Sequence, residues 1–155
     1  EIKGAKPEDE LYKGRISYLL GENKDAISYL EKAKEHKQML ASYYLGLAYD
    51  ANGDSDKAKK CIAEYIKSGV ATSYDLYELG MQEMQDGNYK NALTYFNSGL
   101  ELEKVPNKQN LMKSAIAAYE YSGDFDSAKK MMKEYLKAYP DDEEAKHENT
   151  FLETR

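Results

Sequence analysis

Few side chains in this sequence are of the kinds that catalysis or metal binding usually requires. The chain has one cysteine, Cys61, and two histidines, His36 and His147, which lie far apart in the sequence. A zinc site takes about four ligands, and a nucleophilic cysteine needs a neighbouring base. Neither arrangement is visible, and no glycine-rich phosphate loop is present. We therefore expect no enzyme activity, no metal and no cofactor, and we interpret Cys61 as a small, partly buried apolar residue.

The composition restricts the classes of partner. The 155 residues are 41% apolar and 32% charged, which suits a globular chain long enough for one domain with a core. The net charge of −6 argues against binding to nucleic acid or to anionic lipid, although lysines gather at residues 57–60 and 129–137. No segment approaches the roughly 20 apolar residues of a membrane helix. We expect neither nucleic-acid binding nor direct membrane insertion.

The first residue bears on the compartment. The chain begins with Glu1 rather than methionine, which indicates a processed or truncated product. A cytoplasmic adaptor and the extracytoplasmic part of a lipid-anchored protein would look alike after such processing, so both compartments stay open.

A short motif from glycine to alanine occurs four times. It reads GENKDA, GDSDKA, GNYKNA and GDFDSA, and its glycines are separated by 32, 34 and 36 residues. Apolar residues recur at helical spacing on both sides of each motif, and Gly69, Pro106 and Pro140 stand where the second helices should end. Asp54 and Asp124 are placed to cap the second helices. Each motif is therefore predicted to be the tight turn of an antiparallel helix pair, and the period indicates a repeat protein.

Small residues recur at the positions where the two helices of a pair should touch. One glycine in the first helix and the alanine that ends each motif would let the two backbones approach closely. These positions are Gly14, Ala26, Gly46, Ala58, Gly80, Ala92 and Ala128.

This pattern resembles the tetratricopeptide repeat, a 34-residue helix–turn–helix. Residues 45–58 match it through Leu45, Gly46, Tyr49 and Ala58, and the resemblance extends over residues 8 to 140. It implies an all-α fold, a right-handed superhelix of about four repeats, forming one domain over residues 1–155. The expected repeats are residues 8–38, 39–72, 73–109 and 110–140, and a capping helix is expected at 141–155. That last helix could also be a fifth repeat cut short, and Asp141 or Asp142 could cap it.

The resemblance implies a function in protein binding. First helices line the concave surface in this family, and here they carry tyrosine, methionine and leucine on the side away from the core. We expect this stripe to bury apolar residues of a peptide or protein, with Arg15 and Lys113 as polar anchors. The stripe consists of Arg15, Tyr18, Leu40, Tyr43, Leu47, Tyr77, Met81, Met84, Lys113 and Tyr121. The alternative for each of these residues is that it fills a gap between adjacent repeats.

Two further hypotheses concern the partner. Some members of the family grip carboxylates of chaperone tails with Lys, Asn and Arg, but the corresponding positions here are Leu11, Arg15, Tyr44, Tyr74 and Glu78. Glu78 would repel a carboxylate, so this activity is not expected. The chain could instead be a structural segment of a larger protein or oligomer, its groove filled by its own N-terminal region or by another copy through self-association.

Overall fold

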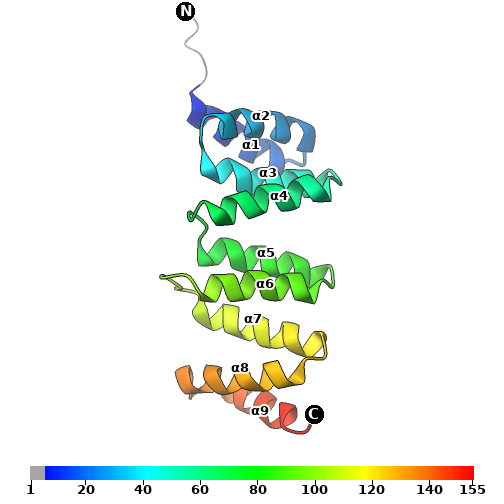
Figure 1. Cartoon of the computed structure of the whole chain (residues 1–155), viewed down its shortest axis with the longest axis vertical. Coiled ribbons are helices and arrows are strands. Elements are labelled where there is room, and N and C mark those ends of the chain that lie inside the picture. Colours follow the sequence, from blue (N-terminus) through cyan, green and yellow to red (C-terminus); the bar gives the residue numbers. More distant parts are fainter. Residues whose placement is uncertain (1–5) are drawn as a thin grey trace, which may run out of the picture. The chain divides into compact units, whose positions relative to one another are not determined.

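Helices account for the regular structure of residues 6–155, the part of the chain that this computed structural model describes (Figure 1). That part contains nine α-helices and no β-strand, so the predicted all-α class is confirmed. The helices are α1 (Pro7–Leu19), α2 (Asn23–Glu35), α3 (Met39–Ala51), α4 (Ser55–Lys67), α5 (Ser73–Gln85), α6 (Tyr89–Leu100), α7 (Lys108–Tyr121), α8 (Phe125–Ala138) and α9 (Glu143–Leu152). The right-handed superhelical course of the whole chain stays a prediction.

The helices group into two compact units, which divide between Ala71 and Thr72. In the first unit α2 packs on α1 and α3, and α3 packs on α4. In the second unit each helix from α5 to α9 packs on the next, and α5 also packs on α7. That residues 1–155 form a single domain stays a prediction.

The four repeated motifs form the turns inside the helix pairs, and all four have the same hydrogen bonds. At the second motif the amide of Gly53 donates to the carbonyl of Asp50 (2.9 Å), and the amide of Asp54 donates to the carbonyl of Tyr49 (2.8 Å). This is the Schellman arrangement, which needs a left-handed backbone at its central residue. Gly53 has a φ of 85°, and the other three motif glycines are also left-handed. The repeated glycine therefore ends each first helix and reverses the chain.

The residue after each of these glycines begins the second helix. Asp124 caps α8 as predicted, because its carboxylate accepts from the amide of Ser127 (3.1 Å). Asp54 stands at the same place before α4 but makes no capping hydrogen bond with its side chain, so the prediction for Asp54 is wrong. The Asp54 carboxylate accepts instead from the side-chain amide of Asn52 (3.3 Å).

In three of the four pairs, α1–α2, α3–α4 and α5–α6, the helices lie too close for a larger residue at the glycine of the first helix. A β-carbon added to Gly80 would lie 2.3 Å from the ring of Phe96, and one added to Gly46 would lie 2.4 Å from Ile62. Gly14 faces Leu30 in the same way. The alanines opposite are buried: Ala26, Ala58, Ala92 and Ala128. The predicted small positions thus lie at the contact between paired helices.

A fifth turn of the same kind lies between α2 and α3, and it has no glycine. The amide of Gln38 donates to the carbonyl of Ala33 (3.2 Å), and Lys37, with a φ of 59°, occupies the left-handed position. A left-handed backbone costs about 1–2 kcal/mol for a residue with a β-carbon, whereas glycine adopts it freely. The first unit is therefore less stable with Lys37 than it would be with a glycine at this position.

Replacing this lysine with glycine should stabilise the first unit. We expect Lys37→Gly to raise the free energy of unfolding by about 0.5–1 kcal/mol, because relief of the strain exceeds the extra entropy of an unfolded glycine. Urea unfolding followed by circular dichroism measures the difference. Gly53→Lys is the matched control and should lower the stability by about 1 kcal/mol. A destabilised Lys37→Gly variant would contradict the assignment of strain to Lys37.

Candidate functional site

The residues with potential chemistry are structural or scattered. Cys61 is buried in the core of the first unit, and burial raises the pKa of its thiol, which disfavours the reactive thiolate. Among the described residues, no three His, Cys, Asp or Glu side chains gather closely enough to hold a metal ion. None of the described helices combines the length and apolar character required to cross a membrane.

In the first unit, an aromatic cluster forms where α1 faces α3. The guanidinium of Arg15 lies 4.9 Å from the ring centroid of Tyr44, at cation–π distance. The ring of Tyr18 meets the same tyrosine edge-on, with centroids 6.3 Å apart. Leu40 and Leu47 of α3 are half-buried. Tyr44 therefore belongs to one cluster with Arg15 and Tyr18, although it is not a member of the predicted stripe.

Tyr43 does not belong to the exposed stripe, and this corrects the sequence prediction. Its side chain is only 5% exposed, and its ring lies 5.3 Å from that of Tyr65 in α4 and 5.2 Å from that of Tyr44. Tyr65 is itself buried. Because two large rings meet there, Tyr43 packs in the core and offers no surface to a partner.

In the second unit, Tyr77 and the two methionines of α5 are half-buried. Tyr77, Met81 and Met84 all pack against a core cluster that includes Phe96. The ring of Tyr77 lies 6.2 Å from that of Phe96, and the hydroxyl of Ser114 in α7 donates weakly to the sulfur of Met81 (3.6 Å). These side chains thus fill space between helices, as the alternative interpretation held, and keep part of their surface exposed.

Tyr121 is the most exposed member of the stripe. It is 68% exposed and stacks on Tyr89 of α6, with ring centroids 5.5 Å apart and an angle of 17° between the planes. Tyr89 lies inside the third repeated motif and is not a member of the predicted stripe. The stacked rings extend the aromatic surface from the end of α7 onto α6.

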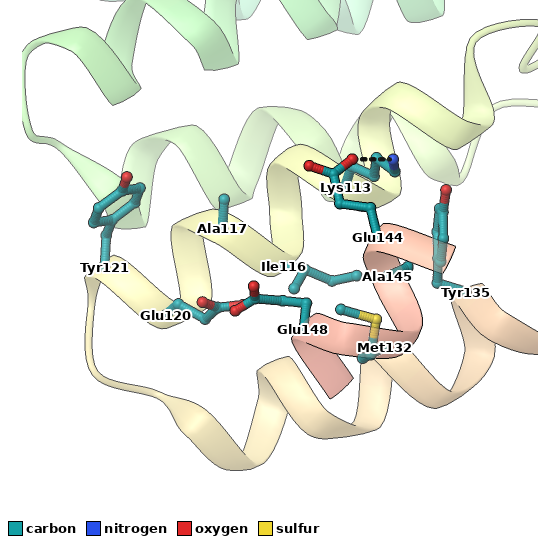
Figure 2. A pocket seen from close by; sticks show the side chains of 10 residues that line it. All are labelled: Lys113, Ile116, Ala117, Glu120, Tyr121, Met132, Tyr135, Glu144, Ala145 and Glu148. Atoms are coloured by element: carbon teal, nitrogen blue, oxygen red, sulfur yellow. Dashed lines mark ion pairs between the residues drawn. The ribbon is translucent and has the colours of Figure 1, made fainter. Parts of the chain in front are cut away.

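A pocket of about 360 Å³ opens between α7 and α9, with α8 at its base (Figure 2). No pair of Cα atoms from α7 and α9 lies within 8 Å, whereas α5 and α7 pack directly. The side chains that line the pocket are Lys113, Ile116, Ala117, Glu120, Tyr121, Met132, Tyr135, Glu144, Ala145 and Glu148. Two of them, Lys113 and Tyr121, belong to the predicted stripe.

Asp142 fixes α9 to the two helices before it. Its carboxylate accepts from the hydroxyl of Tyr135 in α8 (2.5 Å) and from the amide of Ala145 (3.0 Å), and pairs with the ammonium of Lys113 in α7 (2.8 Å). The bond from Lys113, followed by that from Tyr135, holds the pKa of Asp142 well below its usual range. Asp142 is therefore the cap of α9, one of the two residues predicted for that role.

Lys113 is consequently not the free polar anchor that we expected. Its ammonium already pairs with Asp142 and lies 3.6 Å from the carboxylate of Glu144. The bond to Asp142 is the main cause that raises the pKa of Lys113. Asp142 was foreseen only as a cap, because the sequence gives no sign that α7 reaches it.

Two glutamates face each other across the pocket. The side chains of Glu120 in α7 and Glu148 in α9 point toward one another in Figure 2. Burial first, and then the charge of Glu148 and a hydrogen bond to it, raise the pKa of Glu120 to about 7. With a pKa in this range, Glu120 takes up a proton near neutral pH. Neither Glu120 nor Glu148 belongs to the predicted stripe.

Loss of the Asp142 carboxylate should loosen α9. We expect Asp142→Ala to accelerate amide hydrogen exchange in α9 at least several-fold, and Asp142→Asn to have a smaller effect, because asparagine can still cap the helix. The pKa of Asp142 is depressed, so its stabilisation is complete above the usual aspartate pKa and is lost as the pH falls toward the depressed value. Wild-type α9 should therefore exchange faster, relative to α7, once the pH drops below about 4. Equal exchange in the wild type and both variants would contradict this role.

Comparison with known proteins agrees with the helix pairs. A family model of the tetratricopeptide repeat matches residues 40–68 and 109–142, one segment in each unit. Among solved structures, the chain is similar to YrrB, a TPR protein with an unusual peptide-binding site, at a TM-score of 0.63. The identity is 18%, over 95% of this chain and 76% of that one. Comparison with curated proteins gives no match. Two segments of this chain thus match the tetratricopeptide repeat, and the chain shares the fold of a TPR protein.

Proposed function

We propose that this chain is a non-catalytic module that binds a peptide or protein segment on the side of the second unit where α5, α7 and α9 are exposed. The tetratricopeptide-repeat fold supports protein–protein interaction in general, and family and fold point to a repeat scaffold rather than an enzyme. The observation that carries the proposal is the half-exposed stripe of α5, which continues through α7 to a pocket.

The continuity of this surface rests on α7. Ser114 contacts Met81 of α5, and Ala117 and Tyr121 follow it at helical spacing, three and seven residues later. Ala117 and Tyr121 also line the pocket beside α9. Contiguous apolar surface of this kind usually marks an interaction site. YrrB, with its peptide-binding site, supports the same use of the fold.

Tyrosine and methionine suit such a surface for different reasons. Tyr121 offers a large ring with few rotatable bonds, so little entropy is lost when a partner covers it. Met81 and Met84 adapt to irregular partner surfaces. Because the helices exist before binding, most of the ordering cost falls on the partner.

The first unit carries a second surface that fits the same function. Arg15, Tyr18 and Tyr44 form its aromatic cluster, and Leu40 and Leu47 lie on the same helix as Tyr44. We propose that this cluster also contacts the partner.

Selection of peptides from a random library displayed on phage, with the full chain as target, tests the proposal. We expect peptides to be enriched, and Met84→Ala/Tyr121→Ala to weaken their binding at least tenfold, or about 1.4 kcal/mol. The stability of this variant should fall by no more than about 1 kcal/mol, because Tyr121 is exposed and Met84 is only half-buried.

The control for this experiment lies on α8. Glu134→Ala/Lys137→Ala removes two exposed side chains without changing the net charge and should leave peptide binding unchanged. If no peptide is enriched, or if the α8 variant weakens binding as much as the Met84/Tyr121 variant, the proposed surface is wrong.

A second candidate function, assembly, is favoured by the outer side of α1. Tyr12, Ile16, Leu19 and Leu20 are large apolar residues, and their side chains are 65%, 41%, 77% and 67% exposed. Three of them follow the i, i+4, i+7 spacing of one helix face. Such a face is suited to packing against another helix.

Light scattering during size-exclusion chromatography tests the assembly function. If copies associate through α1, the mass should rise with concentration, and Ile16→Glu/Leu19→Glu should restore the monomer because two charges would be buried in the contact. The matched variant Lys13→Gln/Lys24→Gln changes the net charge by the same amount at other exposed positions of the first unit and should have no such effect. A monomer at all concentrations would exclude self-association through this face.

A further inference from the structure

We infer that the pocket between α7 and α9 receives a basic side chain, an arginine or a lysine, of the bound peptide. This inference rests on the proposed function, because the pocket lies at the end of the proposed binding surface. It specifies that the bound peptide has a basic residue in addition to the apolar residues that contact the stripe.

The shape of the pocket suits a long side chain with a polar end. Its volume is about 360 Å³, and its base is formed by the buried apolar residues Ile116, Met132 and Ala145. Arginine and lysine have flexible hydrocarbon stems that pack along apolar surface while their charged ends reach polar groups. The stem would lie over this base.

The charge of the pocket is complementary to a cation. Its lining includes three glutamates, Glu120, Glu144 and Glu148, against one cation, Lys113. Lys113 is already paired with Asp142 and Glu144, which leaves Glu120 and Glu148 facing each other. Two carboxylates held this close repel each other unless a proton or a cation lies between them. A guanidinium can be the cation between these carboxylates, because it donates several N–H hydrogen bonds in one plane.

A side-chain cation fits this pair better than a metal ion does. Calcium takes six to eight oxygen ligands, whereas two carboxylates face each other here. No third His, Cys, Asp or Glu completes a metal cluster in the described part of the chain. An arginine or lysine needs only the two carboxylates and the apolar base.

Binding of the cation should release a proton near neutral pH. Glu120 is half-protonated at about pH 7, and a bound cation favours its charged form. The other charged or titratable groups of the lining are Glu144 and Glu148 of α9, Lys113 and Tyr121 of α7, and Tyr135 of α8. Affinity should therefore rise about tenfold from pH 6 to pH 8, as one proton is released.

Methyl NMR of the full chain tests the inference, with n-butylguanidinium as the probe. The methyl groups of Ile116, Met132 and Ala145 report directly on the pocket base. We expect their signals to shift with a dissociation constant of about 1–10 mM, as suits so small a ligand. Neutral butyramide, which has a similar stem, should shift them at least tenfold more weakly.

Two variants with the same change of charge separate local from general electrostatics. Glu120→Gln/Glu148→Gln should abolish the response to n-butylguanidinium. Glu134→Gln/Glu153→Gln removes two exposed carboxylates outside the pocket and should leave the response intact. His147→Gln should preserve the pH dependence, which excludes titration of the neighbouring histidine.

Several results would overturn the inference. Equal shifts with both probes would make the pocket a purely apolar site, and no shifts would leave it without a ligand of this class. Shifts that depend on chain concentration without any probe would identify a second copy as the occupant. If phage-selected peptides bind through Met84 and Tyr121 but contain no basic residue, the inference fails while the proposed function stands. If no peptides are selected but n-butylguanidinium binds as expected, the proposed function fails while the pocket's preference for a basic group stands.

Discussion

The close approach of two helices within each pair is the constraint on which the rest of the structure depends. Gly46 and Gly80 lie so near the side chains of the second helix that a β-carbon would overlap them. The left-handed glycine at each turn then reverses the chain within a few residues. One side of each first helix packs against its partner helix. The opposite side can therefore hold exposed residues such as Tyr121, which do not contribute to that packing.

The end of the second unit departs from this close packing. Helix α9 packs on α8 but stands away from α7, so a space remains between α7 and α9, whereas α5 and α7 pack directly. Asp142 holds the start of α9 through Lys113 of α7 and Tyr135 of α8. The same network therefore sets the width of the pocket and brings Glu148 within reach of Glu120 (Figure 2). The carboxylate of Asp142 thus positions that of Glu148, which lies in the helix that Asp142 caps.

The sequence allowed the helix pairs to be predicted because the repeat makes each signal appear four times. The turn glycines, the small contact residues and the cap at Asp142 all follow from local rules of helix geometry. The candidate site was less predictable. Tyr43 fits the spacing of an exposed stripe, but its burial depends on Tyr65, 22 residues later in another helix. The pairing of Lys113 with Asp142 and of Glu120 with Glu148 likewise joins residues on different helices. Such pairs leave no periodic pattern in a single sequence, and the glycine-free turn at Lys37 lacks the residue that usually reveals it.

The turn between paired helices has a consequence for how a chain of this kind can change in length. Asp54 closes the last turn of α3 through its amide and is also the first flanking residue of α4, so one position serves both helices. A residue inserted or deleted there would disturb two helices at once, whereas a whole helix pair carries its own turn and its own contact residues. Most packing in each unit joins helices adjacent in the sequence. Evolution can therefore lengthen or shorten such a protein by complete pairs while the corners stay fixed.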